Sequence, residues 1–199
     1  MYSSSNFSKA SIRVSGTNLP PKSPKYPLSS GRLVDIVKDF KFLTQIHLSR
    51  VALWLTLFGY PTKVVPKLSK KEISLCAGGR CRVLTTSRRL EKNLKNLKVE
   101  YLILPNWEDW KTQLCMVLNH FNLSPNLRLN YCPLCLDKLK PVTPEEIKGK
   151  IPEGALRCGK NFTLCPSCGK VYWEGGHKRL MEKTLKQLKL CCKDLFGSF

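Results

Sequence analysis

Apolar residues in the middle of the chain occur in short runs that alternate with helical stripes. Short runs rich in β-branched or aromatic residues predict strands, and apolar positions three or four residues apart predict helices. Strands are expected at residues 40–44, 62–65, 82–86 and 99–104, and helices at 48–58, 69–77, 88–97 and 107–121. This alternation predicts an α/β fold with a parallel sheet, which would bind a ligand beyond the carboxyl ends of its strands. We expect this domain to span residues 39–125.

The pattern changes after Pro125, where turns marked by Pro and Gly replace the alternating elements. Two cysteine pairs, each with a two-residue gap, lie in this part of the chain: Cys132 with Cys135, and Cys165 with Cys168. The short gap lets both sulfurs of a pair point at one ion, and four thiolates make the tetrahedral donor set of structural zinc. We therefore expect a four-cysteine zinc ribbon over residues 130–178. Unligated core thiols and redox pairs are the alternatives.

Three further features belong to this carboxyl-terminal part. The segment from Thr143 to Glu146 has an N-cap, a Pro at the first helical position and two first-turn carboxylates, and it predicts a short helix. Cys158 lies outside both pairs and is interpreted as a spare buried thiol. Residues 177–196 alternate apolar and Lys positions as a basic amphipathic helix. That helix could dock onto the domain or contact phosphates or another protein.

The chain is strongly basic, with 34 Lys and Arg against 14 Asp and Glu and a formal net charge of +20. No carboxylate occurs between Asp39 and Glu72, although six basic residues do. A charge run is often only a solvated face, but an excess over the whole chain favours a polyanionic partner, RNA or DNA. The longest apolar stretch, residues 51–60, is far shorter than the roughly 20 residues of a membrane span, so no membrane partner is expected.

Residues 1–33 are rich in Ser, carry Arg and Lys, and contain no acidic residue. Such a segment cannot bury a core, so we expect a disordered basic tail. The same composition is typical of a transit segment addressed to a mitochondrion or plastid. The first 40 residues lack the apolar run of a secretory signal, and the ten cysteines are therefore interpreted as thiols or metal ligands in an intracellular, reducing compartment, with disulfides as the minor alternative.

Five blocks occur in an order that is typical of one family. They are Phe42-Leu43-Thr44-Gln45, the run from Val51 to Tyr60, the run from Arg82 to Leu90, the pair Gln113-Leu114, and the cysteine pairs followed by Gly169-Lys170-Val171-Tyr172-Trp173-Glu174-Gly175-Gly176-His177. Over residues 40–181 the chain resembles the Mut-seven C-terminal RNase domain, which has a PIN-like fold. The resemblance implies a nuclease-like sheet flanked by helices, with a zinc ribbon appended, that works on RNA.

The resemblance also implies carboxylates at the strand ends, where PIN-like nucleases hold Mg²⁺ or Mn²⁺ for hydrolysis. The family's aspartates fall on Gln45, Pro61 and Ser87 in this chain, and none of these is acidic. Its next acidic pair falls on Ser69 and Lys70, which leaves Glu72 as the remaining acid nearby. The positions that should bind a cation are therefore degenerate, and no catalytic residue is assigned.

Basic residues stand around these positions: Lys63, Lys67, Lys70, Lys71, Arg88 and Arg89. They would repel a cation and attract phosphate, so we expect them to bind RNA. The favoured hypothesis is a catalytically inactive RNA-binding protein within a ribonucleoprotein or RNA-processing assembly that includes protein partners. One alternative is an active ribonuclease that uses Mg²⁺ or Mn²⁺ with Glu72, Glu108, Asp109 or a partner's carboxylates. The other is a zinc-ribbon module for protein interaction.

Overall fold

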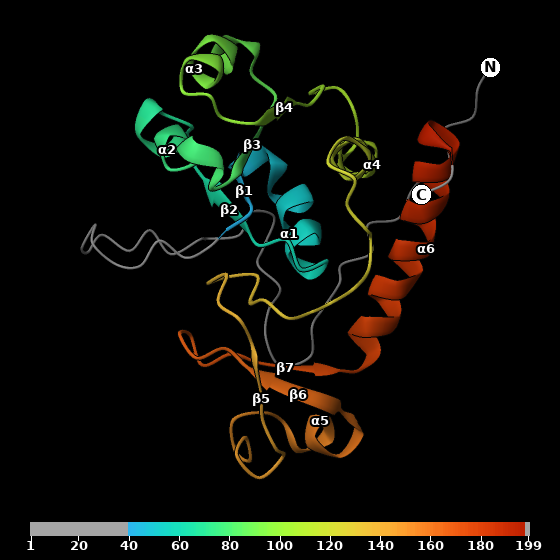
Figure 1. Cartoon of the computed structure of the whole chain (residues 1–199). Helices are drawn as coiled ribbons and strands as arrows, with labels where there is room; N and C mark the ends of the chain where they lie inside the picture. The colour runs from blue at the N-terminus through green and yellow to red at the C-terminus, as the bar shows by residue number, and fades with distance from the viewer. Residues whose placement is uncertain (1–39, 198–199) are drawn as a thin grey trace, which may run out of the picture.

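The structure, a computed structural model, describes residues 40–197. The expected tail or transit segment at residues 1–33 lies outside this range. A four-stranded sheet lies at one end of the molecule and a three-stranded sheet at the other, and a long carboxyl-terminal helix runs between them (Figure 1). No helix among the described residues has both the length and the apolar character to cross a membrane.

The larger sheet is parallel, with the strand order β2-β1-β3-β4. Its strands are β1 (Phe42–Gln45), β2 (Thr62–Val65), β3 (Arg82–Thr85) and β4 (Tyr101–Ile103). The chain places β2 on one side of β1 and then crosses to place β3 on the other side. The winding therefore reverses between β1 and β3, and in open α/β sheets ligands bind beyond the carboxyl ends of the strands at such a point.

Helices alternate with these strands, as the hydrophobic pattern predicts: α1 (Ser49–Leu57), α2 (Lys70–Ser74), α3 (Glu91–Asn96) and α4 (Trp110–His120). Gly59 follows the C-cap of α1, and its φ of +90° suits a residue without a Cβ and lets the Tyr60 amide donate to the Leu55 carbonyl at 2.8 Å. The expected helix at 88–97 is divided, because Arg88–Leu90 forms a 3₁₀ turn before α3. The predicted α/β class is confirmed.

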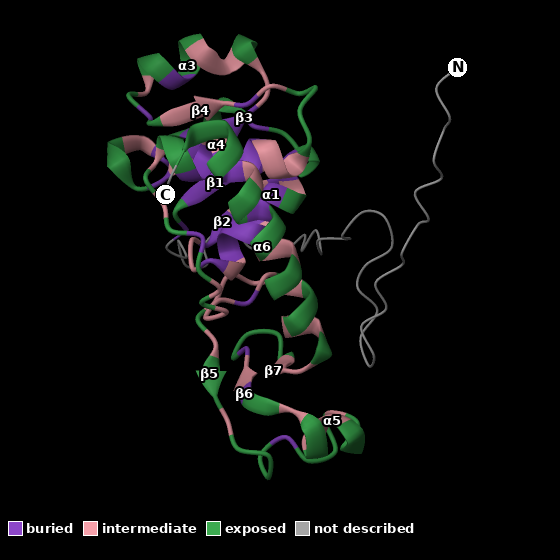
Figure 2. Cartoon of the chain, turned by 90° about the vertical axis from the view of Figure 1, so that its right-hand side faces the viewer, coloured by how far each residue is buried: buried purple, intermediate pink, exposed green. Residues whose placement is uncertain are grey.

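Both faces of the larger sheet are covered, because successive strand residues point to opposite sides. Phe42 and Leu84 join a core formed with α1, α4 and the carboxyl-terminal helix. Leu43 and Val83 join a second core, formed with α2 and α3. Figure 2 shows that the buried residues concentrate in this part of the molecule, whereas the smaller sheet is mostly exposed or half-buried.

The smaller sheet is antiparallel and consists of β5 (Lys140–Pro141), β6 (Lys160–Leu164) and β7 (Val171–Glu174). The helix expected at Thr143–Glu146 does not form. Residues 144–150 make consecutive turns instead, in which the Ile147 amide donates to the Pro144 carbonyl at 3.3 Å and Gly149 has a φ of +79°. The chain then forms α5 (Glu153–Cys158), which the pattern does not predict.

Helix α6 (Gly176–Phe196) follows β7 directly and packs against α4, so the amphipathic helix does dock onto the domain. A disulfide joins Cys115 of α4 to Cys192 of α6, and a second disulfide joins Cys76 to Cys81 between α2 and β3. The expectation that the cysteines are thiols or metal ligands is therefore wrong for these four. Their Cα atoms lie 5.1 and 4.5 Å apart in the two pairs, within disulfide range, and this proximity follows from helix packing and a tight turn.

Candidate functional site

The two cysteine pairs occupy turns of matching form. In the first, the Leu136 amide donates to the Cys132 carbonyl at 2.8 Å, and Leu136 has a φ of +61°. In the second, the Gly169 amide donates to the Cys165 carbonyl at 3.0 Å, and Gly169 has a φ of +66°. The second turn connects β6 to β7, and the first is closed by a bridge between Tyr131 and Lys138. Each turn thus reverses the chain immediately after its second cysteine.

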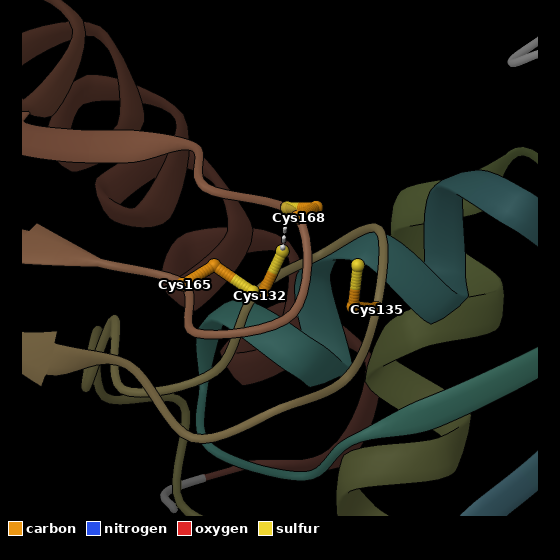
Figure 3. Close-up of side chains that lie close together, drawn as sticks. All are labelled: Cys132, Cys135, Cys165 and Cys168. Atoms are coloured by element: carbon orange, nitrogen blue, oxygen red, sulfur yellow. Dashed lines mark hydrogen bonds between the residues drawn. The ribbon is translucent and has the colours of Figure 1, made fainter. Parts of the chain in front are cut away.

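These turns bring together the four cysteines that the sequence selects, Cys132, Cys135, Cys165 and Cys168 (Figure 3). All four sulfurs lie within 4.8 Å of one another, and those of Cys132 and Cys168 are 3.8 Å apart. Sulfurs bound tetrahedrally to zinc at about 2.3 Å would be about 3.8 Å apart. The cluster could therefore hold a metal ion, and its donors and spacing are consistent with zinc. Cys158, expected to be buried, is exposed and lies outside the cluster.

The protonation of the cluster depends on its surroundings. Burial raises the pKa of Cys132, but a hydrogen bond with the Tyr172 hydroxyl at 3.2 Å and nearby backbone amides outweigh it and hold that pKa below its ordinary value. Burial raises the pKa of Cys135 and of Cys165, and Cys135 is raised further by the neighbouring sulfurs. Thiolates crowded together repel one another, so four of them require a cation between them.

The carboxyl edge of the larger sheet carries a neutral hydrogen-bond network at the reversal between β1 and β3. The Thr85 hydroxyl donates to Oε1 of Gln45 at 3.2 Å, and the Ser87 amide donates to the Thr85 hydroxyl at 3.1 Å. Beside them, the Thr86 hydroxyl and Nε2 of His47 share a hydrogen bond of 3.0 Å. Two of the three degenerate positions, Gln45 and Ser87, are thus brought together at the place where a parallel sheet binds its ligand.

Pro61, the third degenerate position, lies apart from the other two. It precedes β2, and its carbonyl accepts a hydrogen bond of 2.8 Å from the Lys41 amide, just before β1. Because the strands are parallel and start together, Pro61 lies at the amino edge of the sheet. A carboxylate at this position would not share a cation with residues 45 and 87.

Glu72, the remaining acid, is engaged in a helix cap. Its carboxylate accepts hydrogen bonds from the hydroxyl of Ser69 and, at 3.0 Å, from the amide of Ser69 at the start of α2. The hydroxyl contact chiefly holds the pKa of Glu72 below its ordinary value. Asp109 similarly caps α4 by accepting from the amides of Lys111 and Thr112. Both acids therefore already have structural partners.

Five of the six predicted basic residues follow the carboxyl ends of strands: Lys67, Lys70 and Lys71 come after β2, and Arg88 and Arg89 come after β3. All five are exposed, and none forms an ion pair with a residue between 40 and 197. They stand on both sides of Gln45, because β1 lies between β2 and β3. Lys63 differs, since it lies within β2 and its Nζ is 5.5 Å from the centre of the Phe40 ring.

Sequence reasoning missed several residues of these sites. The partner of His47 is Thr86, 39 positions away, and the hydroxyl of Tyr172 contacts a cluster sulfur. No spacing rule links such residues, because the parallel register and the ribbon hairpin bring them together. The block that contains Tyr172 was recognised only through the resemblance.

A comparison with protein families identifies a match for this chain. The model of the Mut7-C RNAse domain matches residues 40–185, which cover the larger sheet, the cysteine cluster and the first half of α6. A comparison with curated proteins and one with solved structures found no match. Since the matched residues make up most of the chain, and its fold and cysteine cluster agree with the resemblance, the chain belongs to the Mut7-C RNase domain family.

Proposed function

We propose that this chain binds RNA without cleaving it and acts in a ribonucleoprotein or RNA-processing assembly. The observation that carries the proposal is the neutral network of Gln45, Thr85 and Ser87 at the carboxyl edge of the sheet, flanked by five exposed basic residues. The family is an RNase domain family, which supports RNA as the polyanion.

The carboxyl edge of the larger sheet offers few of the ligands that a divalent cation needs. Mg²⁺ and Mn²⁺ bind hard oxygen ligands, and nucleases use carboxylates because their charge offsets that of the ion. Among residues 40–197, the four cysteines are the only group of three or more His, Cys, Asp or Glu side chains that could hold a metal ion. A lone amide oxygen from Gln45 supplies no charge, so the edge has little affinity for such an ion.

The basic residues beside this edge are accessible to phosphates. Lys67, Lys70, Lys71, Arg88 and Arg89 are exposed, so RNA could reach them without breaking an ion pair within the described chain. Their charge adds to a net charge of +20, which would attract a polyanion over long range. Without a bound cation, this edge attracts phosphates directly. Lys63 contributes only to the general positive field, because it is held over Phe40.

The cysteine cluster has a structural role in this proposal, with zinc as its ion. Four thiolates prefer zinc among the common cations, and a four-coordinate site leaves no open position for catalysis. Zinc would stabilise the turn between β6 and β7. Helix α6 begins directly after β7. The metal centre thus stabilises the fold and takes no part in a reaction on RNA.

The test combines two measurements on the zinc-loaded full chain. Single-stranded RNA should be retained with a strong salt dependence, and it should stay intact with Mg²⁺ or Mn²⁺. Cleavage that disappears in Glu72→Gln or Glu108→Gln would establish the ribonuclease alternative instead. Binding that a rise in salt leaves unchanged would contradict phosphate recognition, and a protein-interaction module would then fit better.

A further inference from the structure

Trp107 is the most exposed large apolar residue among those described. Its side chain is 79% accessible, whereas Trp54 is buried and Trp110 packs against Trp54 with ring centres 5.9 Å apart. Trp107 lies in the loop between β4 and α4, which starts at the carboxyl edge of the sheet. An indole left in water at a ligand-binding edge, while other indoles are packed, indicates a contact surface.

The loop that carries Trp107 is held at both ends. On one side, Nε2 of Gln113 donates to the Pro105 carbonyl at 2.8 Å. On the other side, the Asp109 carboxylate accepts from the amides of Lys111 and Thr112 at 2.6 and 3.0 Å. The indole is therefore presented from a short anchored segment, and binding would cost little additional ordering.

A cavity of about 260 Å³ lies beside this indole. Ile103, Pro105 and Met116 form apolar parts of its wall, and Thr86, Arg88 and Asn106 supply polar groups. A nucleobase needs this combination, because its faces are apolar and its edge carries donors and acceptors. Thr86 also belongs to the hydrogen-bonded pair with His47, so the cavity adjoins the edge proposed to hold phosphates.

Charge favours a nucleotide over an apolar peptide as the occupant. None of the cavity residues is acidic, and Arg88 makes no hydrogen bond or ion pair with residues 40–197. Arg89 is exposed next to it. A phosphate attached to a base in the cavity would therefore meet guanidinium groups that form no ion pair within residues 40–197.

We propose that this cavity binds one unpaired base of single-stranded RNA, stacked on Trp107, with Arg88 contacting the neighbouring phosphate. The inference rests on the proposed function and adds to it the form of RNA that is bound. Duplex RNA would fit poorly, because its bases are stacked within the helix.

The test uses the zinc-loaded full chain and two probes of equal length, oligouridine and an abasic ribose-phosphate oligomer. Removing a stacking aromatic costs about 5- to 150-fold in affinity, so Trp107→Leu should weaken oligouridine binding by this factor. It should leave the salt slope and the binding of the abasic oligomer unchanged. Trp107→Phe should keep most of the affinity, because it retains a π face. Arg88→Gln should weaken both probes and lower the salt slope by about 0.7.

Leu190→Ala serves as the control, since Leu190 is 63% exposed on α6 and lies outside the cavity. If the wild-type chain binds oligouridine and Trp107→Leu binds it equally well, the base site is wrong. The proposed function would then still hold. An equal loss for the abasic oligomer would also overturn it, because Trp107 would then act through the fold. Failure of the wild-type chain to bind either probe would overturn both proposals.

Discussion

Gln45 and Ser87 are neutral side chains at the carboxyl edge of the sheet, where the proposed function has no divalent cation. Each lies at the end of a strand or directly after one, and a neutral hydrogen-bond network that includes Thr85 connects them. An aspartate at position 45 could accept the same hydrogen bond from Thr85 and would add the charge that a divalent cation needs. Two substitutions should therefore convert this edge into a site for a divalent cation.

We predict that Gln45→Asp with Ser87→Asp creates a Mn²⁺ site. At an ion concentration ten times the dissociation constant, binding would stabilise the fold by about 1.4 kcal/mol and raise the melting temperature by about 3–6 °C. Thermal unfolding with and without Mn²⁺ measures this. The wild type and a Gln45→Asn, Ser87→Asn variant should show no shift. If the double-aspartate variant is folded but Mn²⁺ does not change its melting temperature, these two positions do not form a cation site.

The cysteine cluster allows a matched comparison at the same scale. Cys165→Ser should remove stoichiometric zinc from the purified chain, because its sulfur is buried within the cluster. Cys158→Ser should retain zinc, because Cys158 is exposed and outside the cluster. Metal analysis decides, and equal zinc content in the two variants would exclude the cluster as the site. Lowering the pH should release the metal, since protons compete for thiolates.

At the scale of elements, the segments after β2 and β3 follow the same edge of the sheet, although Lys70 and Arg88 are 18 positions apart in the sequence. We predict that replacing four residues by Gln makes the slope of log affinity against log salt shallower by up to about 3. The four residues are Lys70, Lys71, Arg88 and Arg89. Each phosphate contact on a single strand contributes about 0.7 to this slope. The matched control replaces four lysines of α6 by Gln: Lys178, Lys183, Lys186 and Lys189. This control variant should change the salt slope less than the edge variant does. If the variant with four substitutions at the edge is folded and keeps the wild-type slope, RNA binds to another part of the chain.

Helix α6 depends on a covalent link as well as on packing. Leu188 and Cys192 are buried against α4, and the disulfide between Cys115 and Cys192 closes a loop of 77 residues. We predict that Cys192→Ala lowers the free energy of unfolding by about 3 kcal/mol and the melting temperature by about 6–12 °C under oxidising conditions. Cys191→Ala, which removes a neighbouring free thiol, should have a much smaller effect. Equal melting temperatures for Cys192→Ala and the wild type would argue against the disulfide in solution.

At the scale of the whole molecule, two parts of different character share one chain. The larger sheet is covered on both faces, whereas the smaller sheet is mostly exposed or half-buried (Figure 2). Two of the cluster cysteines lie in the turn between β6 and β7 of the smaller sheet. We propose that residues 39–125 and 130–178 are separate folding units, and that α6 stays docked on the first through its disulfide.

Chelation of the metal should therefore melt residues 130–178 first. Hydrogen exchange should show lost amide protection in β6 and β7 while β1 and β3 stay protected, because metal ligation and ribbon folding are coupled. The wild-type chain with its metal retained is the reference. Simultaneous loss of protection in both sheets would contradict the division into units.

The sequence alone determined the order and type of the elements in the larger sheet, the cysteine cluster and the absence of acids at positions 45, 61 and 87. Such features depend on residues that are close in sequence: strand and helix periods, a two-residue gap between cysteines, and the side chain at a motif position. The local pattern failed at Thr143–Glu146, because a cap and first-turn acids favour a helix, but residues 144–150 form only turns and Gly149 has a left-handed φ.

Only the tertiary structure decided which distant residues meet. Parallel register brings Gln45 to Thr85 and His47 to Thr86, but it places Pro61 at the opposite edge. Packing of α6 on α4 pairs two cysteines that carry no spacing signal, and the anchored loop after β4 leaves Trp107 beside a cavity. The physical reason is that these contacts depend on crossover direction and helix packing, which join segments tens of residues apart and leave no local period in the sequence.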